Sequence, residues 1–375
     1  MTRNDAWLLA ACLLALASAC KGKEMPPKTV TLAAIPLRSV PIPESMDGEA
    51  ISDVEWVDTS TLAVVFQKAT SVTLMSWREG DPPRSLGRKG AGPGDFRMVF
   101  GTAIVDSNRL AVLDGTLSKV SFWTRSGTWV RDTPVDGPFV SGIWATDSGL
   151  IVGRRSASRS RLDLLLVDEQ QGLHRVVRSI LSDSDAALSP CMFCRLGVGA
   201  DLGYASLTAD DTLYRVLRFS QTGKNRALLE RSGVARAEVV PEELDSIAAS
   251  RARDLRKPWS ADPRADAAIK EGLRRYARES PAPKTKCRFA GGPMLDDGGN
   301  VWVPRCTKRS FNAEVDVFDV SGRYVATVNF PPGTTVHRVR SGHVLGAVYS
   351  VDGDQRIQEF RVPSQVRTPT PTRSH

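Results

Sequence analysis

Four cysteines have spacings that could support disulfide or metal chemistry. Cys191 and Cys194 have the spacing of redox pairs and of zinc ligands, whereas Cys287 and Cys306 have 18 residues between them. A hairpin turn centred near Asp297 would place Cys287 and Cys306 opposite each other on adjacent strands. We therefore expect two disulfides, Cys287–Cys306 and Cys191–Cys194, in an exported protein. A Cys194–Cys287 bridge, a four-cysteine zinc site and free thiols are the alternatives.

Histidine and acidic residues do not form a recognisable catalytic motif. The histidines are His174, His337, His343 and His375, and the spacing of His337 and His343 does not suggest a shared site. The sequence contains no nucleophile elbow, phosphate-binding loop or calcium loop. The run from Asp296 to Asn300 resembles a series of calcium ligands, but we interpret it as a hairpin turn. The sequence therefore predicts no catalytic residue, no metal and no cofactor.

The N-terminal segment resembles the signal of a bacterial lipoprotein. A basic Arg3 precedes an apolar run, and the small residues from Ala17 to Ala19 lead directly to Cys20. The run is shorter than the about 20 apolar residues that span a bilayer. We expect residues 1–19 to be removed and Cys20 to carry lipid. The alternative is an ordinary secreted protein with an unmodified cysteine.

Composition and charge limit the partners of the mature chain. Charged residues make up 25% and hydrophobic residues 41% of the chain, and no second long apolar run follows the signal. The net charge of +8 favours anionic partners such as lipid headgroups or acidic glycans, whereas export argues against nucleic acid. Lys21, directly after the lipidation site, favours the periplasmic side of the outer membrane over the inner membrane. We expect a monomer that is attached to this membrane by its lipid.

One pattern of strands and turns recurs along the chain. A strand-like run meets a turn rich in Asp, Ser, Asn or Gly, a second apolar run follows, and a longer strand comes next. A four-stranded unit that repeats every about 40–50 residues is the signature of a β-propeller blade. We therefore predict an all-β, six-bladed β-propeller. The six turns lie at 58–60, 106–108, 147–149, 201–203, 296–300 and 341–342.

A glycine-rich loop and one blade resemble a known family. The loop at 85–96 ends in Gly-Pro-Gly-Asp-Phe, where NHL-like six-bladed β-propellers commonly have Gly-Pro-Gly-Glu-Phe. The segments 300–303 and 317–322 resemble the second and third strands of such a blade. The resemblance covers most of residues 50–362. It implies the fold but not an activity, because propellers host many functions.

A strand from elsewhere in the chain must close the ring of blades. The last blade shows three strands before the tail at 363–375, and the strand-like segment 28–34 has no partner nearby in the sequence. We expect 28–34 to complete the last blade as its outermost strand, with 20–27 as a polar tether. The propeller then spans 28–362, and 363–375 is a disordered tail.

Residues 235–285 interrupt the strand pattern and predict a helical insertion between blades four and five. Pro241 and the acidic residues after it favour the start of one helix, and a second helix is expected from Pro263 to Arg278. The segment 241–288 has twelve Lys or Arg and eight Asp or Glu. We interpret it as a solvated helical hairpin on the rim, with a mobile basic lid as the alternative.

The connections between blades emerge on one face of a propeller, where ligands commonly bind. The glycine-rich loop and the insertion both belong to such connections, so their basic residues could meet there. Arginine suits carboxylate and phosphate because its guanidinium binds two oxygens at once. We predict an anion-binding site that consists of Arg88, Lys89, Arg97, Arg274, Arg275 and Arg278.

These observations leave two main functions open. We expect a non-enzymatic, lipid-anchored propeller of the cell envelope that binds a protein or an anionic glycan. The alternative is a metal-dependent hydrolase or lyase, because lactonases and lyases of this shape hold a metal with clustered His, Asp or Glu in the channel. A purely structural envelope component is a third possibility.

Overall fold

The computed structural model describes most of the β structure of the chain. The described residues are 30–43, 46, 49–66, 70–135, 137, 140–155, 161–168, 174–181, 196–201, 203–207, 215–220, 226–231, 234, 263–264, 266–268, 270–271, 274, 292–305, 314–350, 354–363 and 366. Among these residues, no helix has the length and apolar character needed to cross a membrane.

The strands of the described residues form six sheets, of which five have four strands and one has five. The first three sheets, from the inner to the outer strand, are β3 (Ile51–Trp56), β4 (Thr61–Phe66), β5 (Val72–Ser76) and β6 (Arg84–Leu86); β7 (Val99–Ile104), β8 (Arg109–Asp114), β9 (Lys119–Thr124) and β10 (Trp129–Pro134); and β11 (Val140–Thr146), β12 (Gly149–Arg155), β13 (Arg161–Val167) and β14 (His174–Leu181). The other three are β15 (Leu196–Val198), β16 (Tyr204–Leu207), β17 (Arg215–Phe219) and β18 (Arg226–Glu230); β19 (Met294–Leu295), β20 (Val301–Pro304), β21 (Glu314–Phe318), β22 (Tyr324–Asn329) and β1 (Thr31–Ala33); and β23 (Thr334–Arg340), β24 (His343–Tyr349), β25 (Gln355–Arg361) and β2 (Ile35–Pro41).

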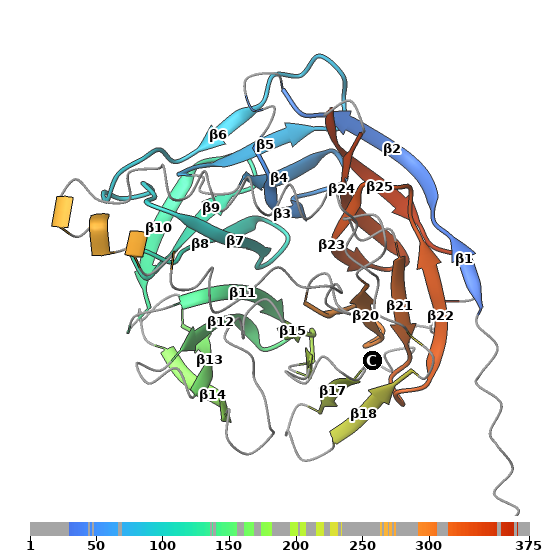
Figure 1. Cartoon of the computed structure of the whole chain (residues 1–375). Coiled ribbons are helices and arrows are strands. Elements are labelled where there is room, and N and C mark those ends of the chain that lie inside the picture. Colours follow the sequence, from blue (N-terminus) through green and yellow to red (C-terminus); the bar gives the residue numbers. More distant parts are fainter. Residues whose placement is uncertain are drawn as a thin grey trace, which may run out of the picture. The chain divides into compact units, whose positions relative to one another are not determined.

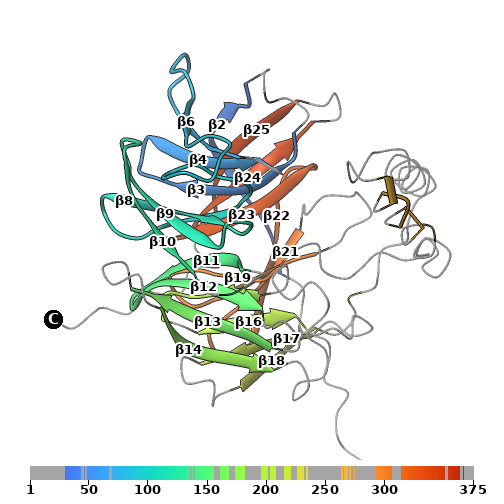
Figure 2. The same cartoon turned by 90° about the vertical axis from the view of Figure 1, so that its left-hand side faces the viewer.

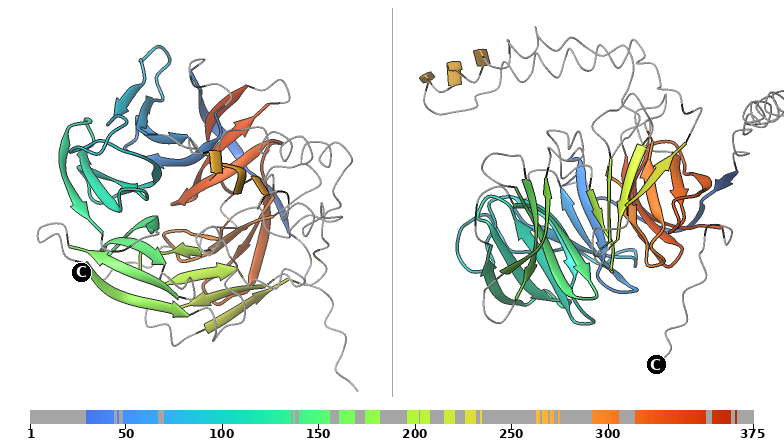
Figure 3. Two further views of the ribbon diagram at one scale, coloured as in Figure 1. Left: turned by 60° about the vertical axis from the view of Figure 1, so that its left-hand side comes forward. Right: turned by 90° about the horizontal axis from the view of Figure 1, so that it is seen from below.

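The sheets are arranged around a common centre, with β3, β7 and β11 on the inside and β6, β10 and β14 on the outside (Figures 1 and 3). Hydrophobic clusters fill the spaces between successive sheets. One of them contains Leu74 of the first sheet and Leu110 of the second, and another joins the last sheet to the first through Leu345 and Val64. This is the architecture of an all-β propeller, as predicted.

The N-terminal strands lie at the periphery of the last two sheets. The pairing of β2 with β25 is antiparallel and makes β2 the outermost strand of the last sheet (Figure 2). The pairing of β1 with β22 is parallel and adds a fifth strand to the preceding sheet. The expectation that 28–34 closes the last blade was therefore wrong. The strand after it, Ile35–Pro41, has this role.

Aspartates in the hairpin turns fix the repeated turn geometry. The Asp58 Oδ1 atom accepts hydrogen bonds from the backbone N–H groups of Ser60 and Thr61, at 2.7 and 2.8 Å. The Asp319 Oδ1 atom accepts from the N–H groups of Ser321 and Arg323, at 2.9 and 3.0 Å. Burial acts to raise the pKa of both carboxyls, but these hydrogen bonds outweigh it and hold each pKa below its ordinary value. The turn signal in the sequence therefore has a direct physical cause.

The run from Asp296 to Asn300 is such a turn, as interpreted from the sequence. It connects β19 to β20, which pair antiparallel. The Asp296 Oδ1 atom accepts from the N–H groups of Gly298 and Asn300, and Oδ2 accepts from the Trp302 side chain. All of these contacts stabilise the hairpin.

Only scattered residues of the predicted insertion are described. Residues 263–264, 266–268, 270–271 and 274 have helical backbone, and Lys270 pairs with Asp266 one turn earlier at 2.8 Å. The remainder of 235–285 lies outside the described residues, and so does the predicted tether at 20–27. The helical insertion as a whole therefore stays a prediction.

Candidate functional site

A cavity at the centre of the ring is lined by the inner strands of all six sheets. Its volume is about 160 Å³, and its lining includes Thr102 of β7, Ile143 of β11, Val198 of β15 and Met294 of β19. The charged lining residues are Glu55 of the first sheet, Asp296 and Asp297 of the fifth, and Arg338 and Arg340 of the last. The cavity therefore lies where the sheets converge, and distant parts of the sequence meet in it.

Two acidic residues of β3 and two basic residues of β23 form a charged network at this cavity, and Glu55, Arg338 and Arg340 of this network line it. Asp53 and Glu55 are two positions apart on one strand, as are Arg338 and Arg340 on the other, so each pair faces the same side. Both strands carry a register shift, between Ile51 and Asp53 and between Val336 and Arg338. Bulges of this kind re-aim side chains next to functional sites.

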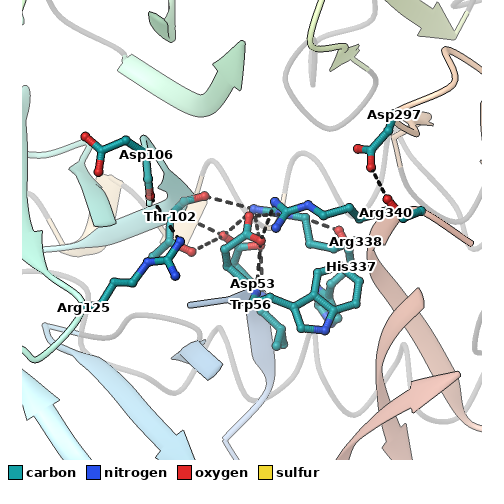
Figure 4. A network of polar contacts seen from close by, with 12 residues as sticks. Asp53, Trp56, Thr102, Asp106, Arg125, Asp297, His337, Arg338 and Arg340 are labelled. Carbon is teal, nitrogen blue, oxygen red and sulfur yellow. Dashed lines mark hydrogen bonds and ion pairs between the residues drawn. The ribbon is translucent and has the colours of Figure 1, made fainter. Parts of the chain in front are cut away.

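Arg338 forms the centre of the polar network (Figure 4). One of its terminal nitrogens, Nη2, is 2.8 Å from Asp53 Oδ1, and its Nε donates to Glu55 Oε2 at 3.0 Å. Nη1 donates to the His337 carbonyl oxygen at 2.9 Å, and Nη2 also donates to the Thr102 carbonyl oxygen at 3.1 Å. Thr102 donates its backbone N–H and its hydroxyl to Asp53 Oδ2, at 2.9 and 3.1 Å. The network thus joins the first, second and last sheets.

Charge in the network is balanced. The Asp53 and Glu55 side chains are 8% and 5% exposed, while that of Arg338 is 30% exposed and faces the cavity. Burial acts to lower the pKa of Arg338, but the two carboxylates outweigh it and raise that pKa above its ordinary value. Arg340 adds a second, more exposed cation whose Nη2 lies 3.3 Å from Glu55 Oε1. The two carboxylates of the network therefore face two guanidinium groups.

His337 lines the same cavity but takes no part in the ion pairs. Its Nε2 atom is buried and has no hydrogen-bond partner among the described residues. Burial lowers the pKa of His337 to about 4, the charge of Arg338 adds to this, and Asp53 opposes it. The imidazole is therefore neutral near pH 7 and offers a hydrogen-bonding nitrogen to the cavity.

A second, larger pocket of about 590 Å³ opens beside the cavity, and Arg340 lines both. We call it the turn-face pocket, because the β3–β4, β9–β10 and β23–β24 turns contribute to it. These turns lie at the end of the ring opposite to the connections between sheets, since strands alternate in direction within each sheet. The pocket is lined by Arg38, Trp56, Val57, Asp58, Thr59, Arg125, Arg340, Ser341, His343 and Glu359.

The predicted basic site lies elsewhere on the molecule. Arg88, Lys89 and Arg97 are exposed and line neither the central cavity nor the turn-face pocket. Arg88 forms an ion pair with Asp95 of its own loop, at 3.1 Å. Arg274 pairs with Glu271 at 3.4 Å, while Arg275 and Arg278 lie outside the described residues. A ligand at these six residues stays a prediction.

The glycine-rich loop packs against the second sheet. Gly87 and Gly94 have positive φ angles of 69° and 70°, and a Cβ atom on Gly94 would lie 2.9 Å from the Trp129 ring. The Gly94 N–H donates to Asp132 Oδ2 at 3.2 Å, and the Phe96 side chain is completely buried. The turn and the close packing therefore account for these glycines.

The predicted cysteine sites cannot be placed. Cys20, Cys191, Cys194, Cys287 and Cys306 all lie outside the described residues. Within the described part of the chain, no three His, Cys, Asp or Glu residues are grouped so that they could hold a metal. The lipidation and disulfide assignments stay predictions.

Sequence reasoning missed the charged network. The signal it could have used is the alternation Asp53-x-Glu55 and Arg338-x-Arg340 within apolar strands, where charged residues on a buried face require partners. The sequence spacing of His337 and His343 does not suggest a shared site. In the structure, His337 lines the central cavity and His343 lines the turn-face pocket.

Comparison with known proteins gives similarity in structure only. No protein-family profile matches the sequence, and no curated protein matches it. A protein described as exported, from Bacteroides fragilis, has 10% identity and a TM-score of 0.48, covering 91% of this chain and 98% of its own. A gluconolactonase from Xanthomonas campestris has 10% identity and a TM-score of 0.47, covering 90% and 100%. A virginiamycin B lyase from Staphylococcus aureus has 11% identity and a TM-score of 0.44, covering 90% and 89%.

Proposed function

We propose that this protein is a ligand-binding module of the bacterial cell envelope, anchored by lipid on Cys20, and that its six sheets are the blades of an NHL-like propeller. The ligand is a protein or an anionic glycan. The observation that carries the proposal is the position of Arg338, which lies between the two carboxylates of the central cavity and pairs with both.

The position of Arg338 disfavours the metal-dependent alternative. A channel metal would need free carboxylate oxygens, but Asp53 accepts hydrogen bonds from Thr102 and Arg338, and Glu55 accepts from Arg338 and Arg340. Binding a divalent cation there would require displacement of the Arg338 guanidinium from two buried carboxylates. Removing one partner from a buried ion pair costs about 3–5 kcal/mol. A binding role uses the same residues without any such displacement.

Two features support an anionic ligand. The chain carries a net charge of +8, and three arginines line the turn-face pocket against two carboxylates. Charges gathered in a concave site focus the electric field and raise the local concentration of anions.

The test is equilibrium binding of the full mature chain to acidic and neutral envelope polysaccharides and to acidic peptides, at low and at physiological salt. We expect saturable binding to an acidic probe that weakens as salt increases, because screening at 0.15 M acts over about 8 Å. Binding to neutral and acidic probes alike, without salt dependence, would contradict an electrostatic site. Turnover of a lactone or glycoside that depends on Glu55 would favour the enzyme instead.

A further inference from the structure

The turn-face pocket contains an arginine that has no acidic partner among the described residues. Arg125 lies just after β9, and its Nη2 donates to the Asp106 carbonyl oxygen at 3.2 Å. Its Nε is buried and lacks a hydrogen-bond partner in the described part of the chain. The Asp106 carboxylate is committed to Arg109, at 2.6 Å. An unsatisfied buried donor lowers stability, and more so when the group is charged, so an acceptor supplied by a ligand would relieve this cost.

The other two arginines of the pocket also retain donors. Arg340 has one contact with Glu55, its side chain is 46% exposed, and its guanidinium lies 5.6 Å from the centre of the Trp56 ring. Arg38 is held by Glu359, by the Thr59 carbonyl oxygen and by stacking on Trp77. Figure 4 shows Arg125 on one side, and Arg338 and Arg340 on the other side, of Asp53 and Trp56.

The acidic side chains of the pocket are already occupied. Asp58 accepts three hydrogen bonds at Oδ1 from Ser60 and Thr61 of its own turn. Glu359 is paired with Arg38 and lies 2.9 Å from His343 Nδ1. The groups left for a ligand are therefore mainly hydrogen-bond donors with positive charge.

The pocket also has the size and the surface for a small ring compound. Its volume is about 590 Å³, and small-molecule sites typically have volumes of about 300–1,000 Å³. Trp56 and Val57 line it as core side chains that are 8% and 1% exposed, and Thr59, Ser341 and His343 supply polar groups that suit hydroxyls.

We infer that the turn-face pocket binds an acidic saccharide, whose anionic group lies between Arg125 and Arg340. This inference rests on the proposed binding role and places the ligand on the face opposite to the glycine-rich loop. Two guanidinium groups suit the carboxylate or the sulfate of a sugar, because each of these anions offers more than one oxygen to the N–H donors.

The experiment is calorimetric titration of the full mature chain with digalacturonate, with a sulfated galactobiose and with neutral galactobiose. We expect one saturable site for an acidic disaccharide and at least ten-fold weaker binding of the neutral one. The two acidic probes distinguish carboxylate from sulfate as the anionic group. Arg125→Gln and Arg340→Gln should each weaken binding at least ten-fold, and thermal melts should verify that both variants fold.

Arg78→Gln is the matched control, since Arg78 is exposed and lies outside the turn-face pocket. Equal binding by wild type, Arg125→Gln and Arg340→Gln would overturn the inference. So would binding of polyglutamate with no binding of either acidic sugar, but this result would leave the proposed binding role intact. The role itself fails only if no acidic envelope probe binds at all.

Discussion

Arg338 contacts more groups of the central polar network than any other side chain described in it. It replaces the solvation of two buried carboxylates, Asp53 and Glu55, and connects strands that are 285 residues apart in the chain. Such a network is costly to assemble but costly to break as well, because each group depends on the others.

Replacing Arg338 by leucine should destabilise the protein strongly. The change leaves two carboxylates buried with one remaining cation, and losing one partner of a buried pair costs about 3–5 kcal/mol. Chemical denaturation at pH 7 measures this. Arg340→Gln is the control, because Arg340 is more exposed and such pairs contribute about 0–1 kcal/mol. Similar losses for the two variants would show that Arg338 is not the centre of the network.

His337 should make stability depend on pH. Its pKa is about 4 in the folded chain against an ordinary value of 6.5, so between these pH values the unfolded chain binds a proton that the folded chain does not. The stability it contributes is complete above pH 6.5 and is lost as the pH falls toward 4.

Between pH 7 and pH 5, the wild type should lose up to about 2 kcal/mol more than His337→Gln. Urea unfolding of both proteins at the two pH values measures the difference. Parallel pH profiles would mean that the histidine is not buried as described.

At the scale of elements, ring closure depends on one N-terminal strand. β2 pairs with β25 along most of its length, and its Val40 contributes to the core between the last and the first sheet. The three residues of β1, by contrast, extend a sheet that is already complete.

Truncations should separate these two strands. A chain that begins at Ile35 should remain folded with a modestly lower melting temperature, because only β1 is lost. A chain that begins at Met46 should lose cooperative unfolding, because the edge of β25 and the adjacent core become exposed. Circular dichroism melts measure both. Equal behaviour of the two truncations would refute the role of β2 in closure.

The repeat and the hairpins could be predicted because their aspartates leave a local signature in the sequence. The sequence predicts 28–34 as the closing strand, whereas β2 closes the ring. Pro36 and Pro41 in β2 are residue types that favour a loop. Proline is tolerated there, since an outermost strand has no partner on one side. The charged network could not be predicted, because the pairing of Asp53 with Arg338 depends on ring closure and not on local sequence.

At the scale of the whole molecule, the predicted lipid on Cys20 determines where the binding site is presented. Cys20→Ala should release the protein from the membrane fraction, because the chain has no other long apolar run. Cell fractionation and the mass of the N-terminal peptide measure this. Unchanged fractionation together with an N-terminal peptide that carries no lipid mass would contradict the anchor.

At the propeller centre, Arg338 pairs with both Asp53 and Glu55, and we propose that these paired carboxylates hold no catalytic metal. The most direct measurement is calorimetric titration of the full mature chain with Ca²⁺, Mn²⁺ and Zn²⁺, alongside the Glu55→Gln variant. We predict that the wild type and Glu55→Gln give the same titration curve with each metal. The reason is that Arg338 already pairs with both carboxylates, so Glu55 contributes to no metal site. One equivalent of metal that binds to the wild type and is lost in Glu55→Gln would contradict the account.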